Sequence, residues 1–284
     1  MYAANFRRWD FPQRWLPAFS SYATPSPARR LAETALGRLL GIVLPADCRL
    51  CQTPLHSSLS RIPVCQRCLA AAEPIQAEHF CAACRTAFLN PRPLDESGRC
   101  YLCRHQVNRF DAAYAFGSYD AELRELIRIF KYQRVETLAR PLGRLLSRAL
   151  PREEAFDAIV PVPLHWRRKW ARGFDQAEAL SRELSRHTGL PVIRGLRRSR
   201  ATAAQSARSQ SIRRKNVAGA FTARVSDLGG KKLLLIDDVF TTGATASACA
   251  AALKGAGARS ITVLTVARAD RRGWAAVTQK GVYG

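Results

Sequence analysis

From about residue 110 onward, apolar residues alternate between short continuous runs and helical repeats. The run at 233–236 has the pattern of a strand buried on both faces of a parallel sheet, and runs at 112–116 and 158–163 also predict strands. Apolar residues from Leu123 to Phe130 recur at the spacing of one helix face, and a second helix is predicted at about 137–149. This alternation predicts an α/β fold, a parallel sheet flanked by helices.

The run at 233–236 is followed by an acidic pair and then by a loop of small and hydroxyl residues. Asp237 and Asp238 come at the carboxyl end of the predicted strand, where open α/β sheets place ligands, and a helix is predicted to follow. Amides at the start of that helix would hold a phosphate, while the carboxylates accept hydrogen bonds from sugar hydroxyls. The sequence therefore predicts a ribose 5-phosphate site, with phosphate-binding candidates Thr241, Thr242, Gly243, Ala244 and Thr245. The simpler interpretation is an ordinary strand, loop and helix in which Asp238 and Thr242 act as caps.

Prolines end the strand at 158–163 and predict an irregular loop at 165–176. This loop is rich in cations and lies between a strand and a helix, where a pyrophosphate would need neutralising. Its candidate pyrophosphate-binding residues are Arg172, Gly173 and Gln176. The alternative is a solvated basic turn in which Trp166 and Trp170 cover the core.

Eight of the nine cysteines fall into four C-x-x-C pairs. Two such pairs complete a tetrahedral four-cysteine zinc site, so a double zinc ribbon with two structural zinc ions is expected at 47–105. Sequential pairing is the simplest arrangement, and interleaved pairing is open. Disulfides are the rival, but the N-terminus lacks the apolar region of a secretory signal, which favours a reducing compartment and metal binding. The predicted ligands are Cys48, Cys51, Cys65, Cys68, Cys81, Cys84, Cys100 and Cys103.

Basic residues dominate the charge, because 45 lysines and arginines stand against 22 acids, for a formal net charge of +23. Such a field attracts polyanions, either nucleic acid or a pyrophosphate substrate. The segment between Glu183 and Asp227 contains no acid, so a groove for the backbone of single-stranded DNA is one interpretation and a ligand-free basic loop is another. The candidate nucleic-acid-binding residues are Arg197, Arg198, Arg200, Arg213 and Arg214.

Residues 1–46 mix aromatics with arginines and are expected to form an extension with an amphipathic helix at about 28–43. Residues 106–284 are expected to form the α/β domain. No apolar run approaches the roughly 20 residues of a membrane span.

Five stretches, taken in order, resemble the ComF family of competence proteins. They are V-P-V-P at 160–163, R-G-F-D-Q at 172–176, the basic stretches 200–205 and 213–221, and the acid-pair motif at 233–245. Together with the cysteine pairs, the likeness runs from about Leu44 to Ala267. It implies a type I phosphoribosyltransferase-like domain preceded by a double zinc ribbon.

The resemblance also implies a cytoplasmic role in DNA uptake and natural transformation. Its implied ligands are phosphoribosyl pyrophosphate and single-stranded DNA, and its implied partner is helicase-like. In transferases of this fold, the region matching 184–226 is a hood over the sugar site. If the domain is catalytic, Mg²⁺ would bridge pyrophosphate and ribose oxygens while Arg172 stabilises the leaving pyrophosphate. The alternative is an active phosphoribosyltransferase of nucleotide or nucleoside metabolism without a DNA role.

Individual positions refine this interpretation. Thr241 stands where purine-salvage enzymes of the superfamily carry an aspartate, which disfavours purine salvage. Asp175 stands where the family usually has asparagine. None of the C-x-x-C pairs has the glycine that often follows the second cysteine, and the residues found there are Gln52, Leu69, Arg85 and Arg104.

Overall fold

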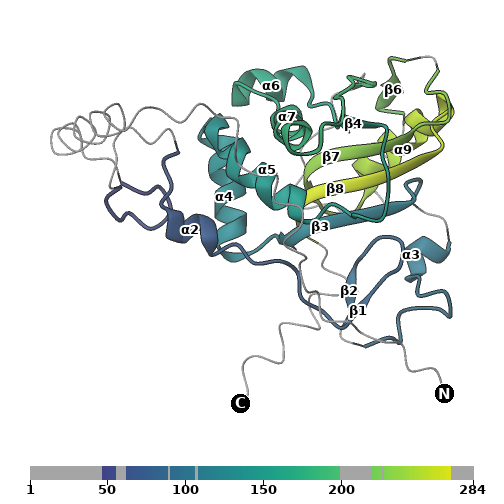
Figure 1. The fold of residues 1–284 in the computed structure, drawn as a ribbon, viewed down its shortest axis with the longest axis horizontal. Helices are drawn as coiled ribbons and strands as arrows, with labels where there is room; N and C mark the ends of the chain where they lie inside the picture. The colour runs from purple at the N-terminus through teal and green to yellow at the C-terminus, as the bar shows by residue number, and fades with distance from the viewer. Residues whose placement is uncertain are drawn as a thin grey trace. The chain divides into compact units, whose positions relative to one another are not determined.

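The computed structural model describes residues 47–55, 62–88, 90–105, 108–198, 219–225 and 227–269 (Figure 1). All of them belong to one of the two compact units of the chain. The helix predicted at 28–43 and the candidates Arg200, Arg213 and Arg214 lie outside these residues. Within the described ranges, no helix is long and apolar enough to cross a membrane.

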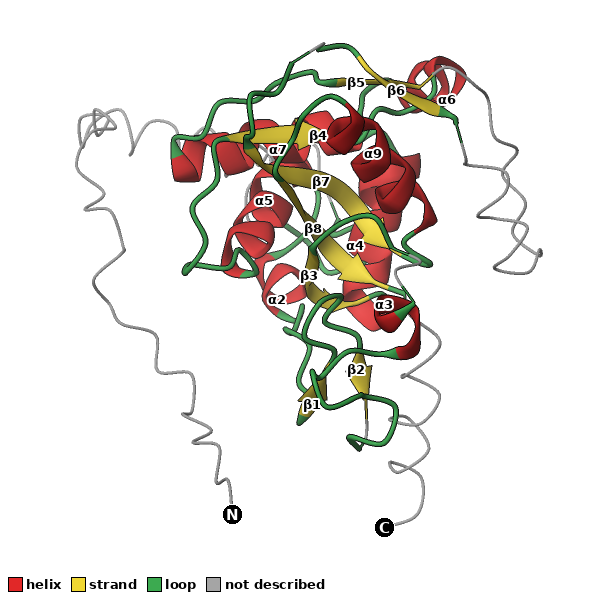
Figure 2. Cartoon of the chain, turned by 90° about the vertical axis from the view of Figure 1, so that its right-hand side faces the viewer, coloured by secondary structure: helices red, strands yellow, loops and turns green. Residues whose placement is uncertain are grey.

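A parallel sheet of four strands, in the order β3, β8, β7, β4, forms the core of the fold (Figures 1 and 2). The strands are β3 (Ala112–Ser118), β4 (Ala158–Pro161), β7 (Lys232–Phe240) and β8 (Ser260–Arg268). The central strands β7 and β8 pair along their whole length, from Lys232 opposite Ser260 to Phe240 opposite Arg268. The predicted α/β class and the predicted strands are confirmed.

Helices cover both faces of this sheet. They are α4 (Ala121–Tyr132), α5 (Ala139–Arg148), α7 (Gln176–Thr188) and α9 (Ala244–Gly255). Leu234 and Ile236 of β7 belong to the cluster that contains α4, α5 and α7, whereas Leu233 and Leu235 belong to the cluster that contains α9. All four side chains are fully buried, which explains why the strand reads as a continuous apolar run.

The cysteine-rich part contains only short elements. They are α2 (Gln66–Ala70), β1 (His79–Phe80), β2 (Ala87–Phe88) and α3 (Tyr101–Arg104). Its cysteines join the clusters that cover the sheet: Cys48 and Cys68 pack with α4, and the last four pack on the side of α9. A further antiparallel pair, β5 (Leu196–Arg198) and β6 (Phe221–Ala223), packs against α9.

The irregular loop predicted at 165–176 is wrong in part, because residues Trp166–Arg172 form helix α6. The prolines do end β4 at Pro161, as expected. The seven residues of α6 contain neither glycine nor proline, and arginine, lysine and alanine are strong helix formers. The helix ends at Gly173, whose φ of 81° only glycine adopts without strain.

Candidate functional site

The first cysteine tetrad consists of Cys48, Cys51, Cys65 and Cys68, whose sulfur atoms all lie within 4.8 Å of one another. The Sγ atoms of Cys48 and Cys68 are 3.9 Å apart, and those of Cys51 and Cys65 are 3.7 Å apart. A tetrahedral zinc ion with Zn–S bonds of about 2.3 Å would separate its sulfur ligands by about 3.8 Å. The tetrad therefore fits such an ion.

The second tetrad consists of Cys81, Cys84, Cys100 and Cys103, which lie within the same limit and are all buried. The Sγ atoms of Cys84 and Cys100 are 3.7 Å apart, and the amide of Cys100 donates to Cys81 Sγ at 3.3 Å. The tetrads follow the sequential pairing, and the interleaved alternative is wrong.

Arg268, at the end of β8, joins the second tetrad to the sheet. Its guanidinium donates to the carbonyl oxygen of Cys84 and to Thr86 Oγ1 at 3.0 Å, and lies 4.2 Å from the ring centre of Phe240. Phe240 in turn packs so closely on the predicted phosphate loop that a Cβ on Gly243 would lie 2.9 Å from its Cζ. Arg268 and Phe240 therefore connect the second cysteine tetrad to the predicted phosphate loop.

The acidic pair lies near the end of β7 and next to a lysine of α4. Asp238 Oδ1 is 2.8 Å from Lys131 Nζ, and both side chains are largely buried. Burial and the neighbouring Asp238 carboxylate raise the pKa of Asp237 to about 7. Burial alone would lower the pKa of Lys131, but Asp238 and Asp237 outweigh it, so that pKa is raised. Asp238 therefore pairs with a cation in the way that buried charges require.

Lys131 is the site residue that the sequence reasoning missed. A usable signal exists, because Lys131 follows Ile127 by four positions and so continues the buried stripe of α4. Lysine at a buried position implies an acidic partner, since an unpaired buried charge is costly.

The predicted phosphate loop leads directly into α9. Gly243 precedes the first helical residue and has φ 73°, a left-handed conformation that suits glycine. No side chain caps the start of the helix, although the amide of Ala244 makes a long 3.4 Å contact with Thr242 Oγ1. Of the two caps named in the simpler interpretation, Asp238 instead pairs with Lys131, and Thr242 makes only this long contact among the described residues. The loop thus combines the amides of a helix start with threonine hydroxyls, an arrangement that suits an anion.

The pyrophosphate candidates meet at the corner between α6 and α7. Arg172 Nη1 donates to Gln176 Oε1 at 2.9 Å, and the guanidinium of Arg172 lies 5.3 Å from the ring centre of Tyr132. Gln176 is buried, so it positions Arg172 in this structure. Tyr132 follows Lys131 directly, so the end of α4 lies between the corner and the acidic pair. Sequence candidates from two separate motifs therefore each contact one of the last two residues of α4.

Asp175 begins α7. Its carboxylate accepts hydrogen bonds from the amides of Glu178 at 3.2 Å and Leu164 at 3.1 Å. Burial raises the pKa of Asp175 against the effect of these two bonds. The residue that departs from the family pattern therefore has a structural task, capping the helix and fixing the chain after β4.

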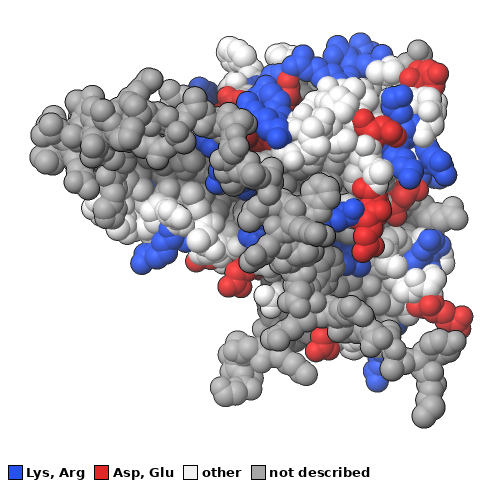
Figure 3. All heavy atoms as spheres, in the orientation of Figure 1, with Lys and Arg blue, Asp and Glu red and all other residues white. Residues whose placement is uncertain are grey.

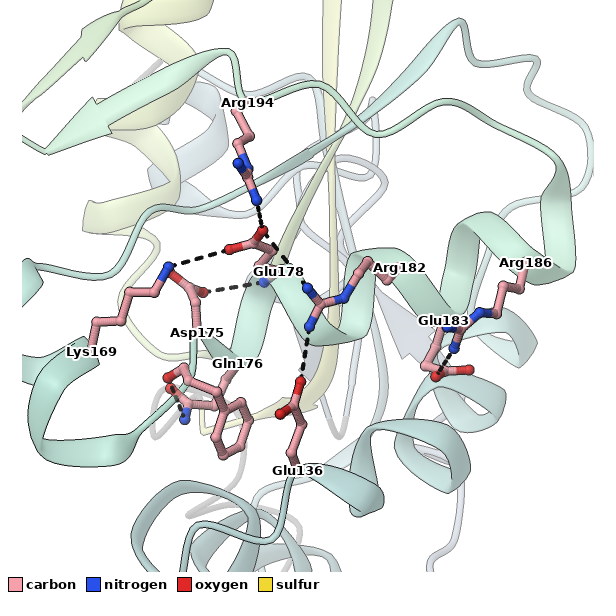
Figure 4. Close-up of polar contacts among 10 residues, drawn as sticks. Glu136, Lys169, Asp175, Gln176, Glu178, Arg182, Glu183, Arg186 and Arg194 are labelled. Atoms are coloured by element: carbon pink, nitrogen blue, oxygen red, sulfur yellow. Dashed lines mark hydrogen bonds and ion pairs between the residues drawn. The ribbon is translucent and has the colours of Figure 1, made fainter.

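Glu178, one turn into α7, collects three cations around its carboxylate (Figure 4). Arg194 forms an ion pair with it, Lys169 Nζ lies 3.5 Å from its Oε2, and Arg182 Nη1 lies 3.9 Å from its Oε1. Although burial opposes the shift, the cations lower the pKa of Glu178. This network ties α6 and the chain before β5 to α7.

Two of the nucleic-acid candidates lie in β5. Arg197 is exposed, whereas Arg198 is half-buried and stacks 5.2 Å above the ring centre of Phe221 in β6. On the face drawn in Figure 3, lysines and arginines gather along the upper edge, where Figure 1 places α6 and β6. The basic character predicted for this part of the chain therefore reaches the surface.

The phosphoribosyl transferase domain family matches residues 170–282. Competence protein F of Haemophilus influenzae is 35% identical over 179 residues, which cover 60% of this chain and 78% of that protein. DNA utilization protein YhgH of Salmonella typhimurium is 30% identical over 234 residues, which cover 80% of this chain and 99% of that protein. Competence protein ComFC of Bacillus subtilis is 33% identical over 113 residues, which cover 39% of this chain and 44% of that protein.

Proposed function

The chain belongs to the ComF family of competence proteins, and from that premise we propose that it serves DNA uptake and natural transformation. In this proposal it binds phosphoribosyl pyrophosphate at the carboxyl end of β7 and single-stranded DNA on its basic surface. It acts in the cytoplasm beside a helicase-like partner that handles the incoming strand.

The observation that carries the sugar-phosphate site is the sequence of groups around the end of β7. Asp237 and Asp238 carry the carboxylates proposed to accept hydrogen bonds from ribose hydroxyls, although Lys131 holds one oxygen of Asp238 and the amide of Asp238 holds one oxygen of Asp237. The start of α9 follows within a few residues. Arg172 lies against Tyr132, which neighbours Lys131 in sequence, and would supply a forked donor for a pyrophosphate. In this proposal the acids, the helix amides and the arginine would each serve one part of the ligand, and Mg²⁺ bound with the ligand would neutralise its phosphate charge.

Both tetrads are proposed to hold zinc in closed structural sites. Four sulfur ligands leave no coordination position for a reacting water, so the ions stabilise the ribbon and take no part in chemistry. Thiols kept for metal binding suit a reducing compartment, which supports the cytoplasmic assignment.

Binding of the sugar phosphate is tested by titrating the full chain with phosphoribosyl pyrophosphate in the presence of Mg²⁺. The wild type should bind in the micromolar to millimolar range, and Asp237→Asn with Asp238→Asn should abolish binding. Asp111→Asn is the control, because Asp111 lies at the amino end of β3 and pairs with the half-buried Lys254. Failure of the wild type to bind would sink this part of the proposal.

Binding of DNA is tested by the salt dependence of affinity for a single-stranded oligonucleotide. Each phosphate contact that is removed should reduce the slope of log K against log salt by about 0.7. Replacing Arg197, Arg198 and Arg200 by alanine should therefore flatten the slope. An unchanged slope would rule out these arginines as phosphate contacts.

An active phosphoribosyltransferase is the second candidate, and the match of the phosphoribosyl transferase domain family to residues 170–282 favours it. The reaction would join an acceptor to the anomeric carbon and release pyrophosphate. Pyrophosphate release in the presence of a panel of nucleobases tests it, and no release with any base leaves the protein as a binding module.

A further inference from the structure

Helix α6 presents two large aromatic side chains to solvent. Trp166 is 66% exposed and Trp170 is 86% exposed, although tryptophan is usually well buried. Together with Lys169 and Gly173, they line an open cleft of about 520 Å³. The sequence-based alternative in which these tryptophans cover the core is therefore wrong. Exposed aromatic surface of this size marks an interaction site.

The geometry of α6 places both indoles on one side. Residues four positions apart in a helix are neighbours on the same face, with Cβ atoms about 5–6 Å apart. The helix is held firmly, because Arg134 Nη2 donates to the carbonyl oxygen of Ala171 at 3.0 Å and Lys169 reaches Glu178. The two aromatic side chains therefore stand on a fixed support.

The sequence of α6 is strongly basic. Helix α6 carries four cations, Arg167, Arg168, Lys169 and Arg172, and no acidic residue. Its remaining apolar residue is Ala171, so it lacks the broad apolar face with which a helix enters a membrane. Aromatic rings interleaved with cations are instead the pattern of a single-stranded nucleic-acid site, where bases stack and phosphates are neutralised.

We propose that Trp166 and Trp170 form a stacking platform for bases of single-stranded DNA. This inference rests on the proposed DNA binding but assigns the stacking of bases to residues other than the candidate arginines. Gly173 belongs both to the cleft and to the pyrophosphate candidates, so the platform adjoins the sugar-phosphate site. A strand bound here would pass beside that site.

The test measures the affinity of the full chain for a fluorescein-labelled single-stranded oligothymidylate by anisotropy. Trp166→Ala with Trp170→Ala should weaken binding on the order of tenfold for each tryptophan, whereas replacement of both by phenylalanine should preserve most of the affinity. Tyr101→Ala is the matched control, since Tyr101 is 62% exposed on α3 of the ribbon, and it should bind as the wild type does. The salt slope of the tryptophan variants should stay unchanged, because stacking releases no counterions.

An abasic strand of the same length gives a second measurement on the wild type itself. Removing the bases should weaken binding by the wild type by about the same factor as removing both indoles weakens binding to the normal strand. A wild type that binds DNA while the alanine variant binds it equally well overturns the platform alone. A wild type that binds no DNA overturns the proposed DNA role and the platform together. A parallel titration uses vesicles of anionic lipid in place of DNA. If the double alanine variant loses binding to these vesicles but keeps binding to DNA, α6 belongs to a membrane surface and the platform is contradicted.

Discussion

The Nζ atom of Lys131 lies 2.8 Å from Oδ1 of Asp238, and this ion pair joins the end of α4 to the carboxyl end of β7. The side chains are only 13% and 11% exposed, so water screens them little. The pair therefore fixes one of the two proposed ribose-binding acids in position. It also fixes the neighbouring Tyr132, on which Arg172 stacks.

Breaking this pair should be costly. Lys131→Met leaves Asp238 buried without its cation and should lower the free energy of unfolding by about 3–5 kcal/mol. Lys254→Met removes the partner of Asp111 at a more exposed pair and should cost at most about 1 kcal/mol. Urea unfolding of the two variants measures the contrast, and equal losses would show that the Lys131 pair is no stronger than a surface pair.

The raised pKa of Asp237 predicts a pH dependence with a definite sign. Its carboxyl binds a proton more tightly in the folded protein, where the pKa is about 7, than in the unfolded chain, where aspartate titrates near 3.9. Wild-type stability therefore falls as the pH rises between these values and does not fall further above them. Asparagine has no such proton, so the stability of Asp237→Asn minus that of the wild type should grow by on the order of 2 kcal/mol from pH 5 to pH 8. A constant difference would show that Asp237 titrates normally.

Gln52 follows the second cysteine of the first pair and has φ 59°, in the left-handed region that favours glycine. Its side chain is exposed, so Gln52→Gly should relieve backbone strain and raise the free energy of unfolding by about 0.5–1 kcal/mol. Leu69 holds the equivalent place after the other pair of this tetrad but lies in helix α2, so Leu69→Gly should destabilise. Thermal unfolding of the zinc-loaded protein measures whether each substitution raises or lowers stability. Destabilisation by Gln52→Gly would show that the backbone at Gln52 is not strained.

The residues that follow the second cysteine of each pair show why some features of the ribbon could not be predicted from sequence. The spacing of the cysteines predicted both tetrads, because two residues between ligands place the sulfurs on the same side. The missing glycines were ambiguous, because only Gln52 and Arg85 adopt the left-handed conformation, while Leu69 and Arg104 lie in helices.

In the α/β domain, too, a local pattern could be predicted from sequence and a long-range contact could not. The apolar run before Asp237 predicted β7 because burial on both faces is a local property of that strand. Arg268 and Thr86 are 182 residues apart, and no local pattern reveals their contact. Helix α6 was missed because the prolines before it gave a stronger signal than helix propensity alone.

Asp175 stands where the family usually has asparagine, and its hydrogen bonds predict how substitutions there affect stability. Its two carboxylate oxygens accept from two different amides, whereas asparagine offers one acceptor oxygen. Asp175→Ala should cost about 1–3 kcal/mol and Asp175→Asn less, because asparagine retains the helix cap. Guanidinium unfolding ranks the two variants, and a larger loss for asparagine than for alanine would disprove the double acceptor.

The central claim is that the end of β7 and the start of α9 bind the ribose phosphate of phosphoribosyl pyrophosphate. The most direct measurement is a calorimetric titration of the full chain with this ligand and Mg²⁺, repeated in the presence of ribose 5-phosphate or of pyrophosphate. Saturable binding that each half-ligand weakens by competition, and that Asp238→Asn removes, is the predicted result. No binding by the wild type, or binding that Asp238→Asn leaves intact, would contradict the claim.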